Sequence, residues 1–209
     1  MDVQREAENH RLVGGELCLD FANTLNGHAW LPHHEYLHDY RDTVLWGRHA
    51  GVLPPDEAGT LLSEAALRPA AAELVYRRGL ELRETIFRIF ASLAGGHPVR
   101  ASDLERLNAA WRDGQAHARL VIISGGFSLG WDDEPCLERL LRAVAASAIH
   151  LLASPQSLQV RSCAGANCDW LFIDASRNHL RRWCSMDECG NRAKMQRRHA
   201  RQKLPIPGA

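Results

Sequence analysis

The chain has 209 residues, 45% of them hydrophobic, and its 25 lysines and arginines balance 25 aspartates and glutamates. This composition excludes global disorder and a fibrous or low-complexity chain. The lack of an apolar run of about 18 residues excludes a transmembrane helix. The zero formal charge indicates no nucleic-acid, membrane or acidic partner. The polar N-terminus lacks the apolar stretch of a signal peptide, so we expect a cytoplasmic protein.

The zero charge is a cancellation between two segments of opposite sign. Residues 1–160 contain 15 arginines and no lysine against 21 acidic residues, a balance of −6. Residues 161–209 contain ten basic residues against four acidic ones, a balance of +6. Asymmetry of this kind indicates that the two segments have different partners.

Apolar periodicity predicts several helices in the first part of the chain. Segment 17–25 is apolar but too short for its periodicity to distinguish a strand from a helix start. An amphipathic helix is expected over 36–50, ended by Gly51. Another helix is expected to start at the turn formed by residues 53–56 and to run to about Leu67. The clearest helix is expected over 70–94, where the apolar residues fall on one face.

Further along the chain, the spacing of apolar residues changes from a helical pattern to that of strands. Ser102 and Glu105 form a capping-box pattern at the start of a short helix. Residues 119–131 contain two apolar runs around a Gly-Gly pair, which predicts a β-hairpin, and a last amphipathic helix is expected over 135–153. The predicted fold class is therefore α+β but mostly α, with residues 1–157 as one helical domain that carries a small β-hairpin.

Four of the six cysteines lie close together in the pattern C-x4-C-x15-C-x4-C, at Cys163, Cys168, Cys184 and Cys189. In a reducing compartment, clustered thiols indicate metal binding rather than disulfides. Two thiol pairs joined by a loop can surround one ion, and four thiolates leave no open position, so we predict one structural Zn²⁺. Iron–sulfur clusters accept the same ligands, but nothing else in the sequence suggests redox chemistry. Zinc binding worth on the order of 10 kcal/mol would fold a segment that is too short to be stabilised by burial alone.

The remainder of this segment predicts a finger domain over residues 158–209 that ends in a basic helix. Residues 170–174 read as a strand, and Asp174 or Ser176 could cap a short helix that follows. Residues 190–203 form a basic helix with few apolar positions. Such a helix gains little from burial, so we expect it to face a polyanion; the alternative is a solvated basic tail.

The cysteine segment resembles the CGNR zinc finger, a family named for the tetrapeptide at its last cysteine, here Cys189-Gly190-Asn191-Arg192. The resemblance is carried by Cys163 and by residues 168–176, 182–186 and 189–194. In that family the finger follows an N-terminal domain called ABATE, and the run Leu17-Cys18-Leu19-Asp20-Phe21-Ala22-Asn23-Thr24 resembles the opening motif of that domain. The resemblance implies a bacterial transcription regulator, sometimes described as stress-related, with the four cysteines as zinc ligands and the finger as the DNA-binding part.

A DNA-binding finger needs basic side chains that reach phosphates. Four thiolates and one Zn²⁺ sum to −2, which lowers the +6 of this segment to about +4. The predicted phosphate contacts are Arg177, Arg181, Arg182, Arg192, Lys194, Arg197, Arg198 and Arg201. Asn191 and Arg192 could instead read base edges. Equally, Asn191 could cap the backbone and Arg192 could pair with Asp174.

A competing metal motif lies in the N-terminal part, where His34-Glu35-Tyr36-Leu37-His38 matches the H-E-x-x-H pattern of zinc peptidases. Pro32 places His34 in the first turn of a helix, and the residues that precede the motif are too few for the sheet that would hold a substrate. We therefore expect a polar helix start with surface histidines and no catalytic site, and keep a zinc peptidase as a remote alternative.

Three polar residues of the ABATE-like motif, Asp20, Asn23 and Thr24, could line a ligand pocket, but we favour a structural role in a helix cap and a turn. The main hypothesis is a transcription regulator that binds DNA through its finger, with an acidic N-terminal domain that senses a small-molecule effector or forms a homodimer. The alternative is a zinc-stabilised module that binds protein or RNA.

Overall fold

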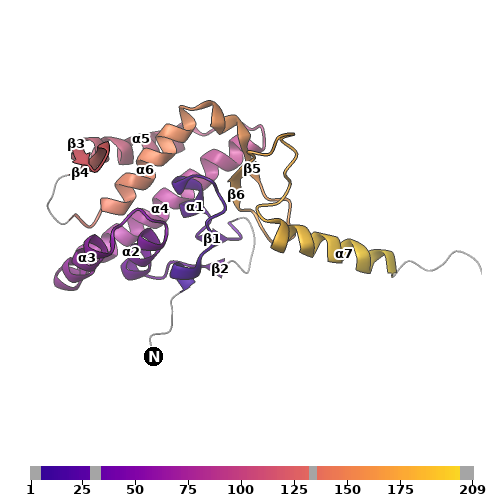
Figure 1. Ribbon diagram of the computed structural model, residues 1–209, viewed down its shortest axis with the longest axis horizontal. Helices are drawn as coiled ribbons and strands as arrows, with labels where there is room; N and C mark the ends of the chain where they lie inside the picture. The colour runs from indigo at the N-terminus through magenta and orange to yellow at the C-terminus, as the bar shows by residue number, and fades with distance from the viewer. Residues whose placement is uncertain (1–5, 29–33, 132–135, 203–209) are drawn as a thin grey trace, which may run out of the picture.

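The structure, a computed structural model, describes residues 6–28, 34–131 and 136–202. Most of the described chain forms a helical body, and a small finger with one projecting helix lies beside it (Figure 1). The helical elements are η1 (Glu6–Asn9), α1 (Leu17–Ala22), α2 (Tyr40–His49), α3 (Pro55–Leu67), α4 (Pro69–Ala94), α5 (Ala101–Gln115), α6 (Arg139–Leu152), η2 (Pro155–Gln159), η3 (Met186–Gly190) and α7 (Asn191–Gln202). The strands are β1 (Leu25–Asn26), β2 (His34–Glu35), β3 (Ala118–Ile123), β4 (Gly126–Trp131), β5 (Val160–Ser162) and β6 (Leu171–Ile173).

The core of the body lies where α1, α2, α4 and α6 meet. Phe21, Trp46, Ile86 and Val144, one from each helix, are fully buried there. Gly47 of α2 permits this close approach, because a Cβ atom at that position would lie 2.8 Å from a methyl group of Leu53. The predicted apolar faces of the long helices are therefore the faces that form the core.

Most of the predicted helices are present, but three begin later or earlier than expected. The helix expected from residue 36 begins at Tyr40, because Asp39 caps it by accepting the N–H of Asp42 at 2.7 Å. The helix expected from residue 135 begins at Arg139. Helix α5 begins at Ala101, before the expected capping box, and no side chain caps it. The undecided segment 17–25 forms helix α1 and the short strand β1.

The predicted hairpin is confirmed as β3 and β4, which pair antiparallel over six residues each. Its turn contains Gly125 at φ +94°, a backbone conformation that favours glycine. One face of the hairpin carries Leu120, Ile122 and Phe127, whose side chains are largely exposed. The described side chains of the hairpin therefore add little to the core of the body.

The two predicted parts of the chain share one hydrophobic core. Val160 of β5 and both Leu171 and Ile173 of β6 are buried within the core of the helical body, although all three follow the predicted boundary at residue 157. Antiparallel pairing joins these strands, with Val160 opposite Ile173. Among the described residues, no helix is long and apolar enough to cross a membrane.

Candidate zinc centre and nucleic-acid interface

The four clustered cysteines lie together as their spacing predicts. Their Sγ atoms are all within 4.8 Å of one another, and all four side chains are buried. The Sγ atom of Cys184 lies 3.7 Å from those of Cys168 and Cys189. A tetrahedral site with Zn–S bonds of about 2.3 Å has sulfur–sulfur edges of about 3.8 Å. The arrangement therefore fits a closed site for one zinc ion.

Backbone N–H groups support the thiolates. Gly165 and Cys184 donate their N–H groups to Sγ of Cys163 at 3.4 and 3.3 Å. The neighbouring thiols of Cys168 and Cys184, together with these N–H groups, lower the pKa of the Cys163 thiol. Donors of this kind fix the orientation of metal ligands and stabilise their charge.

Arg181 holds the zinc loop together from outside. Its guanidinium donates from Nε to the carbonyl of Trp183 at 3.0 Å and from Nη2 to the carbonyl of Cys184, and lies 4.4 Å from the ring centre of Phe172. These contacts occupy the side chain within the finger. We therefore no longer expect Arg181 to contact phosphate.

The helix expected after Asp174 does not form. Asp174 is buried and accepts instead the N–H of Ser176 and the N–H of Arg181, both at 3.0 Å. These hydrogen bonds fold residues 174–181 into turns, so Asp174 stabilises a loop rather than a helix.

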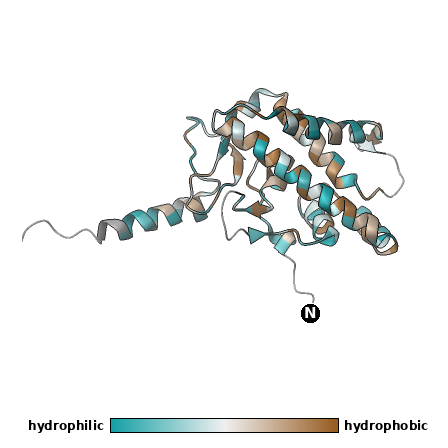
Figure 2. Ribbon diagram, turned by 180° about the vertical axis from the view of Figure 1, so that it is seen from behind, coloured by the Kyte–Doolittle hydropathy of each residue, from teal (hydrophilic) through white to brown (hydrophobic). Residues whose placement is uncertain are grey.

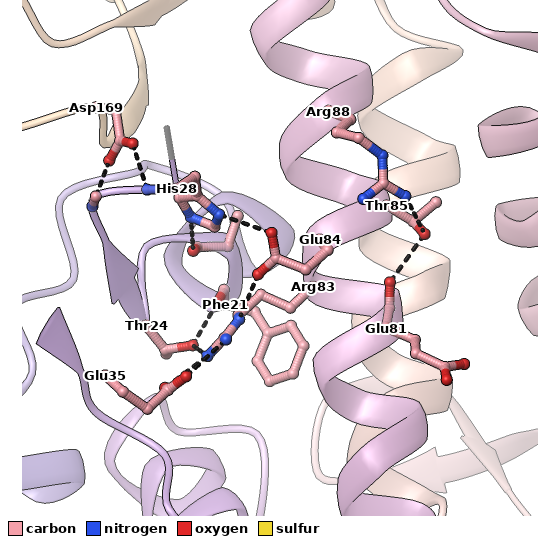
Figure 3. Close-up of polar contacts among 12 residues, drawn as sticks. Phe21, Thr24, His28, Glu35, Glu81, Arg83, Glu84, Thr85, Arg88 and Asp169 are labelled. Atoms are coloured by element: carbon pink, nitrogen blue, oxygen red, sulfur yellow. Dashed lines mark hydrogen bonds and ion pairs between the residues drawn. The ribbon is translucent and has the colours of Figure 1, made fainter. Parts of the chain in front are cut away.

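The N-terminal part holds the finger through Asp169, the residue after the zinc-loop cysteine Cys168. Asp169 accepts the backbone N–H groups of Gly27 and His28 at 3.1 and 2.7 Å (Figure 3). The His28 imidazole in turn lies 2.9 Å from a carboxylate oxygen of Glu84 on helix α4 and stacks on Phe87. Burial raises the pKa of Glu84, but the hydrogen bonds and positive charges of His28 and Arg83 together outweigh it, so the net pKa is lowered.

Glu35 and Arg83 form a second link in this region. Both guanidinium Nη atoms of Arg83 donate to the Glu35 carboxylate, at 2.6 and 2.7 Å, and the Arg83 side chain is only 4% exposed (Figure 3). This bidentate pair joins strand β2 to helix α4. Sequence patterns did not indicate roles for His28, Glu84, Arg83 and Asp169, because their partners lie far away in the chain and no local motif marks them.

The three candidate ligand-binding residues are buried, and hydrogen bonds within the protein occupy their side chains. Asn23 makes two hydrogen bonds with the backbone of Leu171. Thr24 donates its hydroxyl to the carbonyl of Phe21 at 2.7 Å. Asp20 accepts the N–H of Gly14 at 2.7 Å, and burial raises the pKa of Asp20 to about 6. These contacts favour the structural role over a ligand pocket.

The H-E-x-x-H motif does not lie on a helix, so the expected polar helix start is wrong at this point. His34 and Glu35 form β2, which pairs antiparallel with β1, and helix α2 begins only after His38. His34 contacts Glu6 at 2.9 Å, and Glu35 is bound to Arg83. Within the described parts of the chain, the four cysteines are the one group of three or more metal-ligating side chains close enough to share an ion.

Helix α7 follows directly from the last cysteine and extends away from the helical body (Figure 1). Figure 2 colours most of its length as hydrophilic. The exposed basic residues of this region, all from the predicted set, are Arg177, Arg182, Arg192, Lys194, Arg197 and Arg198. The side chain of Arg201 lies outside the described residues.

The side chains of Asn191 and Arg192 differ in their contacts. Asn191 donates its side-chain amide to the carbonyl of Asp187 at 3.1 Å, so it braces the turn that precedes α7. Arg192 is exposed and does not pair with Asp174, whose carboxylate accepts hydrogen bonds from Ser176 and Arg181.

Comparisons with known protein families match nearly the whole chain. Residues 15–155 match the model of the ABATE family, described as "Putative stress-induced transcription regulator". Residues 159–202 match the model of the CGNR zinc finger. No curated protein matches the chain. The finger match and the four-cysteine cluster together support one structural zinc ion.

Proposed function

Because the chain belongs to the ABATE family and ends in a CGNR zinc finger, we propose that it is a transcription regulator that binds DNA through its finger and helix α7. The observation that carries this proposal is the position of α7, which projects from the zinc loop with its described basic side chains exposed (Figure 1). The helix contains five basic and no acidic residues. A helix of this composition is stabilised by a polyanion rather than by burial.

The dimensions of α7 suit a DNA groove. Its 12 residues span about 18 Å, and the major groove of B-DNA, about 12 Å wide, admits one helix. Arg197 and Arg198 lie on the outer half of α7, and Arg182 lies at the zinc loop, where it stacks on Trp183. We assign phosphate contacts to these exposed residues together with Arg177, Arg192 and Lys194. Zinc keeps the loop folded and thereby sets the direction of the helix.

The acidic N-terminal part completes the proposal. Its formal charge of −6 would repel DNA, so that DNA contacts only the basic finger. We assign to it the sensing of an effector or the formation of a homodimer, in a protein that acts in the cytoplasm and carries no catalytic site. Its hydrogen bonds to Asp169 and Leu171 give it a direct mechanical link to the finger.

The test is binding of the zinc-loaded chain to duplex DNA, followed by fluorescence anisotropy at low salt. We expect Arg197→Ala/Arg198→Ala to weaken binding about tenfold or more, because two charges that neutralise phosphates are removed. The matched control is Arg68→Ala/Arg77→Ala, which removes the same charge from exposed positions of the helical body and should leave affinity nearly unchanged.

The same assay distinguishes the alternative function. If the chain does not bind DNA at low salt, or binds it equally well without Arg197 and Arg198, the DNA proposal fails. Tighter binding of RNA than of duplex DNA would favour the RNA-binding module.

A further inference from the structure

A cavity of about 440 Å³ lies between helices α4, α5 and α6, within the helical body. Its apolar lining comes from Leu82 of α4, Ala109 and Ala110 of α5, and Leu141 of α6. A volume of this size is in the range of pockets that bind small molecules. The cavity is separate from the zinc loop and from the predicted ligand residues Asp20, Asn23 and Thr24, none of which lines it.

Arg142 of α6 places a buried positive charge in the cavity wall. Its side chain is 8% exposed, and its Nε atom is buried without a hydrogen-bond partner among the described residues. The carboxylate it approaches, that of Asp113, has its nearest oxygen 3.7 Å from Nε, beyond hydrogen-bond distance, and the Asp113 side chain is 63% exposed. The ion pair with Asp113 therefore leaves the hydrogen-bonding capacity of the Arg142 guanidinium incompletely used, which is costly for a buried group.

Charges at the mouth restrict the kind of anion that could enter. Arg78 and Arg106 line it, but so do Glu81, Asp113 and Glu138. Three carboxylates disfavour a doubly charged phosphate more strongly than a singly charged carboxylate. The apolar lining also offers a phosphate few partners, whereas it suits a hydrocarbon group.

We propose that this cavity binds a small organic carboxylate with an apolar body. The carboxylate pairs with the guanidinium of Arg142 in a charge-assisted hydrogen bond, and the apolar part lies against Leu82, Ala110 and Leu141. Binding itself does not depend on the proposed DNA function. Only an effect of the ligand on DNA binding rests on that function.

Calorimetry on the full-length, zinc-loaded chain tests the proposal with phenylacetate as the probe. We expect saturable binding of phenylacetate, with phenylacetamide about tenfold or more weaker, because the neutral amide loses the hydrogen bond to the charged group. Arg142→Met, which keeps the side-chain bulk, should lose binding by a similar factor. It should lower the melting temperature little, because the ion pair that it removes is long and its partner Asp113 stays solvated.

Two further variants test the cavity independently of Arg142 and control for the loss of a charge. Ala110→Leu narrows the cavity from α5 without changing Arg142, and should weaken phenylacetate binding even if Arg142→Met folds poorly. Arg77→Met, which removes an exposed positive charge of α4 that does not line the cavity, is the matched control and should leave binding nearly unchanged. The proposal is overturned if phenylacetate does not bind at up to about 10 mM, well above a weak dissociation constant of about 1 mM. It is also overturned if Arg142→Met binds as well as the unmodified chain, or if inorganic phosphate binds more tightly than phenylacetate.

Discussion

Asn23 and Leu171 are hydrogen-bonded in both directions: the side-chain Nδ2 of Asn23 donates to the Leu171 carbonyl at 2.9 Å, and its Oδ1 accepts the Leu171 N–H at 2.8 Å. The two residues are 148 positions apart in the chain. The Asn23 side chain therefore makes the two hydrogen bonds with the Leu171 backbone that a neighbouring strand would otherwise make with β6. These hydrogen bonds connect the finger segment to the helical body.

Asn23→Ala should lower the free energy of unfolding by about 2 to 4 kcal/mol, because a buried backbone N–H and carbonyl lose their partner together. Chemical denaturation of the zinc-loaded chain measures this change. Asn26→Ala is the control, because Asn26 makes an exposed hydrogen bond to the carbonyl of Asn167 and removing it should cost well under about 1 kcal/mol. Equal losses of stability for the two variants would contradict the role given to Asn23.

Arg83→Met should destabilise the chain by about 3 kcal/mol or more, since it leaves the Glu35 carboxylate without its bidentate partner. Thermal and denaturant unfolding provide the measurement. Arg77→Met, in an exposed pair with Glu73, should change stability by less than about 0.5 kcal/mol. If the two substitutions have the same effect, the Arg83 pair does not hold β2 to α4.

The local patterns of the sequence predicted the parts of this protein whose causes are local. Apolar periodicity located the long helices, and the cysteine spacing located the zinc loop, because both depend on residues close in the chain. The contacts of Asn23 with Leu171, and of Asp169 with His28, depend on how distant segments pack, and the sequence contains no signal for them. The helix start expected at His34 from the preceding Pro32 was wrong, because pairing of β2 with β1 and the ion pair of Glu35 with Arg83 favour an extended backbone there.

Metal content tests the assignment of the zinc ligands. We expect one zinc ion per chain by elemental analysis, absent from Cys184→Ser because a serine hydroxyl does not replace a thiolate. His38→Ala should retain the zinc, because His38 lies outside the cysteine cluster. A second zinc that depends on His34 and His38 would contradict this assignment and support the peptidase alternative.

The pH dependence of stability should depend on two buried groups with opposite effects. Burial raises the pKa of Asp20 to about 6, so its contribution to stability is full below the unfolded pKa of about 4 and is lost as pH rises through about 6. Burial lowers the pKa of His10 to about 4, so its contribution is full above the unfolded pKa of about 6.5 and is lost as pH falls through about 4. The two effects partly cancel between pH 4 and 6.5.

Asp20→Asn should expose the effect of His10. The variant should lose stability more steeply than the unmodified chain as pH falls from about 6 to 4, by a difference on the order of 2 to 3 kcal/mol across this range. Denaturant unfolding of both proteins at each pH measures this difference, and a loss of zinc common to both cancels in it. Parallel stability curves for the two proteins would show that Asp20 does not titrate in this window.

The salt dependence of DNA binding tests the central claim most directly, because its slope reports the number of phosphates that the finger neutralises. We expect the logarithm of the association constant to fall linearly with the logarithm of salt concentration. Arg197→Ala/Arg198→Ala should reduce the slope by about 1 to 2, at about 0.9 for each phosphate that is no longer neutralised. Arg68→Ala/Arg77→Ala should leave the slope unchanged. An unchanged slope in the α7 variant, or the same reduction in both variants, would contradict DNA binding through helix α7.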